Sequence, residues 1–349
     1  MFGENKSYGL EKMMNTKGKT LIKKAVAVIT LSAFLISLTA CGSGKQTITD
    51  ADGNTIEVTT QDRNSESVVD KYKKTVEQSQ YMMHALGGMN GKTYINSLDG
   101  LKMTYEAGYR LFEGDVCFTS DDVLVMAHSG KDNVWSEADW NERIGVAYPF
   151  KDENGEELTE SDMDFFRKNG YSFENHTCSY DSFMSFRIQG EYKATSFAEV
   201  VDFMSKHDDM YLMVDAGNRS YESTKKLYEM IVEACGNNPL ILDRLIAGGQ
   251  TTDMMKAVKE TYDFPILNMY YAADDVREES IYTTDQFIQY CKDNQIISFS
   301  TAKETYNETV GAELKKGGLI SYVFTVDSFE EADLMRSYGA DIIGTNFLW

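Results

Sequence analysis

From Tyr81 to the C-terminus, short apolar runs alternate with longer stretches in which apolar residues recur every three or four positions. The short runs predict strands, and the longer stretches predict amphipathic helices. The expected strands are 81–84, 110–116, 211–215, 241–247, 266–270, 296–299, 322–326 and 342–344. The expected helices are 96–107, 197–207, 221–235, 252–262, 284–293, 308–316 and 329–338. Repeated strand–helix units are typical of a parallel sheet with helices outside it.

Eight such strands favour an α/β fold of the closed (β/α)8 type, a TIM barrel, and the roughly 270 residues after position 80 suit its usual size. An open doubly wound sheet is the alternative, and it usually carries a glycine-rich phosphate loop after its first strand. Here the first strand leads into a glycine-rich segment, 84–91, that lacks GxGxxG spacing, and the sequence contains no Walker motif. The pattern therefore favours the barrel.

One connection is too long for a plain loop. The segment of about 129–195 follows the second strand and contains Trp135 and Trp140 among many acidic and aromatic residues. Long connections in compact domains are usually functional or disordered. In a barrel, this insertion would leave the end at which active sites lie. A lid or substrate rim and a solvated decoration are equally consistent with the sequence.

The first forty residues have the pattern of an export signal. Four lysines between positions 17 and 24 precede an uncharged run, 25–40, that ends in Leu38-Thr39-Ala40-Cys41. This ending resembles a bacterial lipobox, which implies that Cys41 is lipidated and anchors an exported protein to the outer face of the cell membrane. An ordinary secretory signal with a chance cysteine is the alternative. Residues 41–80 are then expected to be a polar spacer with a small hairpin around Asp52-Gly53, and 81–349 the barrel.

Composition excludes several classes of protein. The 349-residue chain is 42% hydrophobic and 26% charged, which is globular composition. Its formal net charge of −21 argues against nucleic acid as a partner, because phosphate backbones need a basic surface. Four cysteines after Cys41 lack CxxC spacing, so a zinc site is not expected and buried thiols are slightly preferred to disulfides. They are Cys117, Cys178, Cys235 and Cys291.

Five ionisable residues fall near the ends of the first three predicted strands. His84 closes the first strand, Glu113 and Asp115 alternate on the second, His128 follows the next apolar run, and Asp215 closes the third. Period-two alternation points the two carboxylates of the second strand to one face. Three carboxylates suit a hard cation, Ca²⁺ or Mg²⁺, and two imidazoles supply an acid and a base near neutral pH. Such a set is suited to cleavage of a phosphodiester.

Two parts of the sequence make this interpretation more specific. His84, the stretch Gly108-Tyr109-Arg110-Leu111-Phe112-Glu113-Gly114-Asp115-Val116-Cys117-Phe118-Thr119-Ser120-Asp121, and then Val125-Met126-Ala127-His128 resemble the glycerophosphodiester phosphodiesterase family, which belongs to the phosphatidylinositol-phospholipase-C-like superfamily. The stretches 323–327 and 339–346 are similar to the closing strands of that family.

The resemblance covers residue 81 to the end and implies a (β/α)8 barrel that hydrolyses small phosphodiesters. It implies that Glu113, Asp115 and Asp215 bind one divalent cation, and that His84 and His128 form the acid–base pair.

The sequence departs from the family pattern at two cationic positions. Ala85 stands where the family has an arginine after the first histidine, and Gly217 stands where a lysine commonly faces the phosphate. Arg219 is expected to substitute for that lysine and to bind the substrate. The leading interpretation is hydrolysis of glycerophosphodiesters or related head groups at the cell surface. Gly217 favours the alternative, a non-catalytic barrel that binds a phosphorylated ligand or a wall polymer. A barrel glycosidase with paired carboxylates is disfavoured by the histidines.

Overall fold

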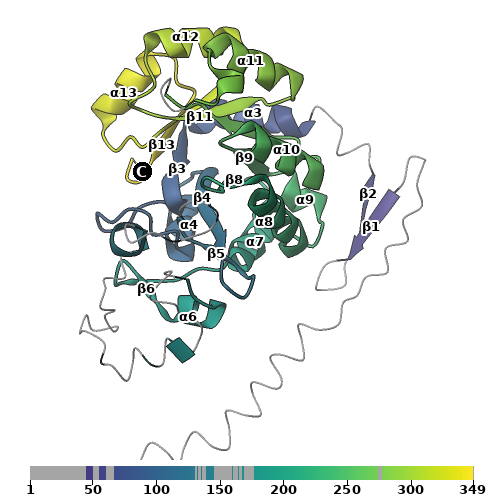
Figure 1. Ribbon diagram of the computed structural model, residues 1–349, viewed down its shortest axis with the longest axis vertical. Helices are drawn as coiled ribbons and strands as arrows, with labels where there is room; N and C mark the ends of the chain where they lie inside the picture. The colour runs from purple at the N-terminus through teal and green to yellow at the C-terminus, as the bar shows by residue number, and fades with distance from the viewer. Residues whose placement is uncertain are drawn as a thin grey trace, which may run out of the picture.

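The computed structural model describes residues 45–49, 55–59, 67–129, 177–273 and 277–348, and residues 132, 135, 139–144, 159, 164, 167 and 168 of the insertion. In this part of the chain, eight parallel strands follow one another in chain order around a ring, and the last strand pairs with the first (Figure 1). The strands are β3 (Tyr81–Met83), β4 (Leu111–Phe118), β8 (Tyr211–Asp215), β9 (Leu245–Gly249), β10 (Leu267–Tyr270), β11 (Ser298–Ala302), β12 (Ile320–Phe324) and β13 (Ile342–Thr345). The chain therefore forms the closed (β/α)8 barrel that the strand–helix pattern predicts.

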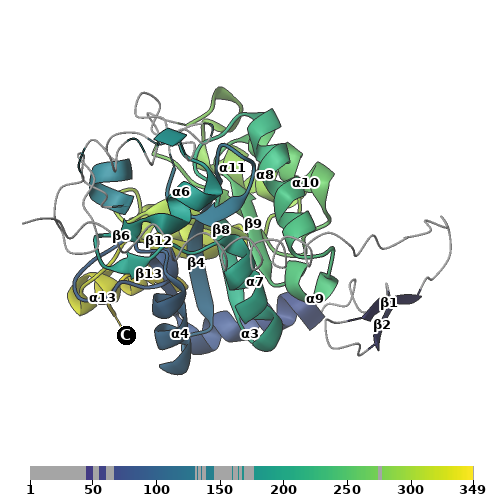
Figure 2. The ribbon, with the colours of Figure 1, turned by 90° about the horizontal axis from the view of Figure 1, so that it is seen from below.

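Helices surround the ring of strands, as Figures 1 and 2 show. They are α4 (Leu98–Glu106), α7 (Phe197–Lys206), α8 (Tyr221–Ala234), α9 (Pro239–Leu242), α10 (Thr252–Thr261), α11 (Thr284–Asp293), α12 (Glu308–Lys316) and α13 (Phe329–Ser337). Each begins after a serine, threonine or asparagine whose side chain accepts a backbone N–H of the first turn. These local caps explain why the predicted helix starts lie within two residues of the observed ones.

One predicted strand, 241–247, is wrong in its first half. Pro239–Leu242 form the short helix α9, and the strand β9 begins only at Leu245. Asn238 caps this helix by accepting the N–H of Leu240, and Pro239 at the first helical position fixes the required backbone angle. A single apolar run is thus divided between two elements, because both contain buried apolar residues and an apolar run alone does not distinguish a short helix from a strand.

The segment expected to be a polar spacer contains ordered structure. The predicted hairpin is confirmed, because β1 (Lys45–Thr49) pairs antiparallel with β2 (Thr55–Thr59). Residues 67–79 form α3 (Ser67–Ser79), on which Tyr72 and Val76 are buried against the amino ends of the barrel strands. The ring of Tyr72 lies 5.3 Å from that of Tyr211, the first residue of β8. Figure 2 shows α3 beneath the barrel, at the end opposite the insertion.

The insertion has a small core of its own on the other end of the barrel. The strand β5 (Leu124–Met126) precedes the insertion and pairs antiparallel with β4. The described elements of the insertion are a π-helix (Asp139–Ile144), α6 (Tyr180–Ser185) and the ribbon of β6 (Arg187–Ile188) and β7 (Tyr192–Lys193). Trp135 is buried and stacks on Phe183 with 5.7 Å between ring centroids. The insertion is therefore packed onto the outer part of β4 and β5.

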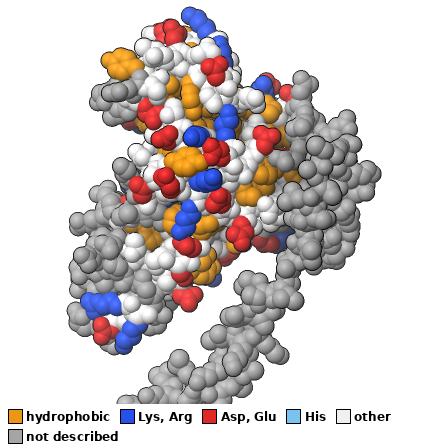
Figure 3. All heavy atoms as spheres, turned by 45° about the vertical axis from the view of Figure 1, so that its right-hand side comes forward, with side chains coloured by type: hydrophobic (Ala, Val, Ile, Leu, Met, Phe, Trp, Pro, Cys, Tyr) orange, Lys and Arg blue, Asp and Glu red, His pale blue; other side chains and the backbone are white. Residues whose placement is uncertain are grey.

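The four cysteines that follow Cys41 are free and buried in this structure, the alternative that the sequence slightly favours over disulfides. The signal-like segment 1–40 and Cys41 lie outside the described residues. Within the described residues, no helix is both long enough and apolar enough to cross a membrane. Figure 3 shows a face on which acidic and basic side chains are interspersed with separate apolar ones.

Candidate active site

Three carboxylates meet inside the carboxyl end of the barrel. Glu113 and Asp115 lie two residues apart on β4, so both point inward, and they are 2% and 3% exposed. The strand register places Asp115 beside Asp215, the last residue of β8. Ligand oxygens of the three side chains lie within 4.8 Å of one another. This cluster is the one predicted from the strand ends.

The electrostatics of this cluster fit a divalent cation. Burial, together with the negative charges of Asp115 and Asp215, raises the pKa of Glu113 well above its usual value. The pKa of Asp215 is also raised, by burial and by the charge of Asp115, although Asp215 accepts the N–H of Gly217. The Oε2 atom of Glu113 accepts the N–H of Ala85, whereas its buried Oε1 has no hydrogen-bond partner. A hard cation would satisfy this oxygen and offset the repulsion.

His84 is held in one orientation by a chain of hydrogen bonds. It begins the short 3-10 helix His84–Leu86, and its Nδ1 donates to Oδ1 of Asn346 over 3.0 Å. The Nδ2 of Asn346 donates to Asp327 over 2.9 Å, and a carboxylate accepts only, so the Oδ1 of Asn346 must face the imidazole. The Nε2 of His84 is therefore left for the cavity, where it lies 3.9 Å from Glu113.

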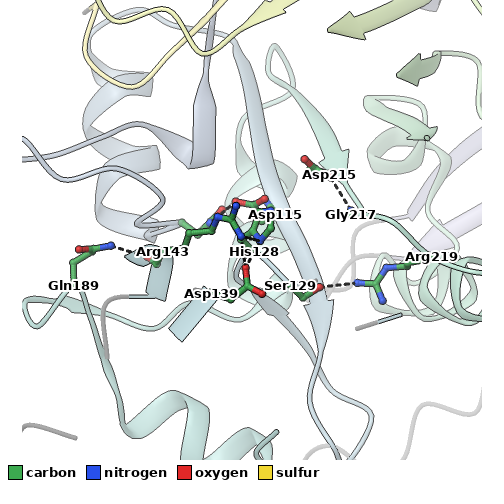
Figure 4. Close-up of polar contacts among 10 residues, drawn as sticks. Asp115, His128, Ser129, Asp139, Arg143, Gln189, Asp215, Gly217 and Arg219 are labelled. Carbon is green, nitrogen blue, oxygen red and sulfur yellow. Dashed lines mark hydrogen bonds and ion pairs between the residues drawn. The ribbon is translucent and has the colours of Figure 1, made fainter. Parts of the chain in front are cut away.

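His128 is held in the same manner by a residue of the insertion. Its Nδ1 donates to Asp139 over 2.7 Å, and Asp139 is fully buried in the π-helix. Burial and the positive charge of Arg143 oppose the charged imidazole. The hydrogen bond to Asp139 and the charges of Asp115 and Asp215 outweigh them, so the pKa of His128 is raised above its usual value. Figure 4 shows His128 between Asp115 and Asp139.

The two imidazoles face one cavity of about 310 Å³, which is large enough for a small ligand. Tyr94 stands between them and makes edge contacts with both rings, at centroid distances of 5.0 Å to His84 and 6.0 Å to His128. Tyr270 and Phe324 form part of the aromatic wall. The cavity is thus lined by two carboxylates of the cluster, Glu113 and Asp215, together with two oriented imidazoles and an apolar surface.

Arg219 does not line this cavity among the described residues. Its side chain is buried and donates to the carbonyl oxygens of Ala216 and Val116 and to the hydroxyl of Ser129. Figure 4 shows it beyond Ser129, on the side away from Arg143. Its position therefore gives no support to the predicted substrate-binding role, because backbone carbonyls of β4 and of the loop after β8 already engage the guanidinium.

Several residues of the site were not predicted from the sequence. Tyr94 lies in an irregular loop, Asn346 follows the last strand, and Asp139 and Arg143 belong to the insertion. The one local signal was the Asp139–Arg143 pair, which has the spacing of neighbours on one helix face. Nothing local to these residues indicates that they contact the two histidines.

The chain resembles known proteins at the level of family and of structure. A model of the glycerophosphoryl diester phosphodiesterase family matches residues 88–348. No curated protein matches the chain.

Solved structures share the fold at low sequence identity, and three of them each match 77% of this chain. A candidate glycerophosphoryl diester phosphodiesterase from Silicibacter pomeroyi has 16% identity and a TM-score of 0.58, with 90% of its own chain covered. A phosphodiesterase from Oleispira antarctica, in complex with the product sn-glycerol-3-phosphate, has 13% identity and a TM-score of 0.55, with 93% covered. A glycerophosphodiester phosphodiesterase from Parabacteroides distasonis has 16% identity and a TM-score of 0.51, with 94% covered. Because the family model spans most of the chain and the barrel carries its acidic and histidine residues in one cavity, this protein belongs to the glycerophosphoryl diester phosphodiesterase family.

Proposed function

We propose that the protein hydrolyses glycerophosphodiesters or related phosphodiester head groups, with one divalent cation and two histidines. The observation that carries the proposal is the fixed orientation of both imidazoles beside the carboxylate cluster. Each donates its Nδ1–H to a buried partner, Asn346 for His84 and Asp139 for His128. Each Nε2 is then available to a substrate in the cavity. The product complex of the Oleispira relative supports a small glycerol phosphodiester as substrate.

Glu113, Asp115 and Asp215 would hold the cation, Ca²⁺ or Mg²⁺. When bound, the ion supplies positive charge to the phosphoryl oxygens as negative charge develops on them. Three carboxylate ligands and a buried Glu113 oxygen without a partner support this assignment.

His128 is the general acid in this proposal. Its hydrogen bond to the buried Asp139 favours the imidazolium, which can protonate the leaving alkoxide. His84 is the general base, because its Nδ1 donates to a neutral amide and its Nε2 keeps a lone pair for the proton of the attacking hydroxyl or water.

The test is turnover by the purified protein on glycerophosphocholine and glycerophosphoethanolamine, followed by release of sn-glycerol 3-phosphate, with Ca²⁺, Mg²⁺ or EDTA. We expect activity that EDTA abolishes and that His84→Ala or His128→Asn reduces at least about 10²-fold. His207→Asn is the matched control, because His207 stacks on Phe203 and donates to the carbonyl oxygen of the same residue outside the cavity. Cation and phosphate binding without turnover on either substrate would instead favour the non-catalytic barrel, to which the missing side chain at Gly217 points.

The protein is proposed to act outside the cell, held by lipid on Cys41, on the basis of the lipobox-like ending of the N-terminal segment. Cys41→Ser should release the protein from the membrane fraction and prevent incorporation of labelled fatty acid. Unchanged membrane association of this variant would argue against the anchor.

A further inference from the structure

The cavity has an excess of acidic groups and one guanidinium. Among the described residues that line it, Arg143 is the one lysine or arginine, whereas Glu113 and Asp215 are carboxylates. A phosphodiester is an anion, so a cavity that binds it near these groups needs positive charge besides that of one cation. Arg143 is therefore the side chain to consider for direct contact with the phosphate.

Two nearby positions do not supply that charge. Gly217 has φ +61°, and a Cβ added there would lie 3.0 Å from the carbonyl oxygen of Ser129, so a longer side chain would be strained. Arg219, two residues later, is 2% exposed, and its Nη2 atom lies 3.2 Å from the Ser129 hydroxyl and 3.3 Å from the Val116 carbonyl oxygen. The loop after β8 thus presents no cation to the cavity among its described residues.

Arg143 is anchored at both its backbone and its side chain. The Nε2 of Gln189, at the end of β6, donates to the Arg143 carbonyl oxygen over 2.7 Å, and the Gln189 N–H donates to that of Ile144 over 2.7 Å. The Nη1 of Arg143 donates to Asp139, the same carboxylate that orients His128, and lies 3.2 Å from the Nδ1 of His128. Figure 4 shows Gln189, Arg143, Asp139 and His128 in this succession.

The guanidinium keeps donors for a ligand. Its Cζ lies 5.6 Å from the centroid of the Tyr94 ring, and its side chain is 34% exposed, on the wall that carries His128. An arginine has five N–H donors in a planar fork that matches two oxygens of a phosphate. Asp139 engages Nη1, so the fork is oriented before a ligand arrives.

We propose that Arg143 binds the phosphoryl oxygens of the substrate, so that the insertion supplies the cation that the loop after β8 lacks. This inference rests on the proposed function for the identity of the substrate. It also assigns the insertion a role as part of the binding site rather than as a decoration of the surface.

The experiment measures binding of sn-glycerol 3-phosphate and of inorganic phosphate by calorimetry, in Ca²⁺ and in Mg²⁺. Arg143→Met removes the charge and keeps an unbranched stem, and Arg143→Lys keeps the charge without the fork. We expect Arg143→Met to weaken binding of both probes at least tenfold and Arg143→Lys to recover part of the loss. Arg167→Met is the control, because Arg167 is an exposed residue of the same insertion that pairs with Asp164. Binding by Arg143→Met within twofold of the wild type would overturn the proposal.

A second variant separates binding from folding. Arg143→Met leaves buried Asp139 without one partner, so the double variant Asp139→Asn/Arg143→Met removes that carboxylate charge as well. Both variants are compared with Asp139→Asn alone, after thermal unfolding has shown that each is folded. If the loss of phosphate affinity appears only when Arg143 is absent, the proposal holds. An equal loss in Asp139→Asn alone overturns it.

If the wild type binds phosphate through Arg143 but hydrolyses no diester, the proposed function fails while this inference stands.

Discussion

Both imidazoles of the site are fixed through Nδ1, but their partners differ in charge. Asn346 is a neutral amide, held by Asp327, whereas Asp139 is a carboxylate with no exposed surface. A buried carboxylate favours the imidazolium form of His128. A neutral acceptor orients His84 without adding a charge beside it. In the proposed mechanism, these single residues suit the two histidines to different proton transfers, His128 as the acid and His84 as the base.

Asp139→Asn should destabilise the protein more at acidic than at alkaline pH. Because the pKa of folded His128 is raised, the protonated imidazole stabilises the fold below the unfolded value of about 6.5, and this contribution disappears as pH rises through the folded pKa. The free energy of unfolding of the variant should be lower than that of the wild type by about 1–3 kcal/mol at about pH 5.5, and by less at about pH 9. Urea unfolding of the variant and the wild type, without metal, measures this stability difference at each pH. The titration of Glu113 and Asp215 is common to both proteins and cancels when their stabilities are subtracted.

The same variant tests the acid role of His128. Loss of the carboxylate should move the alkaline limb of the kcat/KM profile to lower pH, because less imidazolium is present at a given pH. His207→Asn serves again as the unaffected control. If the pH profile of kcat/KM is unchanged and the loss of stability does not depend on pH, Asp139 orients Arg143 but does not affect the protonation of His128.

At the scale of elements, the close packing of α12 against the end of α13 depends on a glycine. Gly311 is buried on α12, and a Cβ added there would lie 2.1 Å from the Tyr338 carbonyl oxygen at the end of α13. The same Cβ would lie 2.8 Å from the hydroxyl oxygen of Tyr306. The two helices can approach this closely only because no side chain stands between them.

Gly311→Ala should lower the free energy of unfolding by about 1–3 kcal/mol, although alanine is intrinsically the better helix former by about 1 kcal/mol. Activity per folded molecule should not change, because α12 lies on the outside of the barrel (Figure 1). Glu313→Ala, at an exposed position of the same helix, is the matched control and should stay within about 0.5 kcal/mol of the wild type. Greater stability of Gly311→Ala than of the wild type would show that the helices can move apart at little cost.

At the scale of the whole molecule, the fold holds three mutually repelling carboxylates together at the carboxyl end of the barrel. The carboxylates of Glu113, Asp115 and Asp215 are brought together by strands whose hydrophobic packing is formed elsewhere in the sheet. Because the pKa of Glu113 is raised in the metal-free protein, its contribution to stability is present below its unfolded pKa and is lost as pH rises. A cation that binds the folded state reverses this loss by mass action.

Ca²⁺ or Mg²⁺ should therefore raise the stability at neutral pH, by about 2.7 kcal/mol when the free ion is about 100 times its dissociation constant. Glu113→Gln should reduce this response. In EDTA the variant should be at least as stable as the wild type, because it removes a buried charge that two neighbours repel. Thermal unfolding across a metal titration measures both effects, with the exposed Glu233→Gln as control. A wild-type response no larger than that of Glu113→Gln would exclude the cluster as the cation site.

The sequence by itself determined the order of strands and helices and the convergence of five site residues. Helix boundaries follow local caps and three-to-four-residue periodicity, and the inward pair Glu113 and Asp115 follows from alternation along one strand. Closure of consecutive parallel strands then brings His84 and Asp215 to the same mouth. These features are set by interactions between residues that are near in sequence or by the regular geometry of the barrel.

Only the tertiary structure decided which side chains support and complete that site. Arg219 is near Asp215 in sequence but is engaged by backbone carbonyls, whereas Arg143 reaches the cavity wall from an irregular insertion. Asn346 meets His84 across 262 positions of the chain. Helix α3, within a segment expected to be a polar spacer, closes the barrel because Tyr72 and Val76 find apolar strand ends to cover. Local pattern carries no information about such contacts, since their energy depends on the burial and partners that the folded chain supplies.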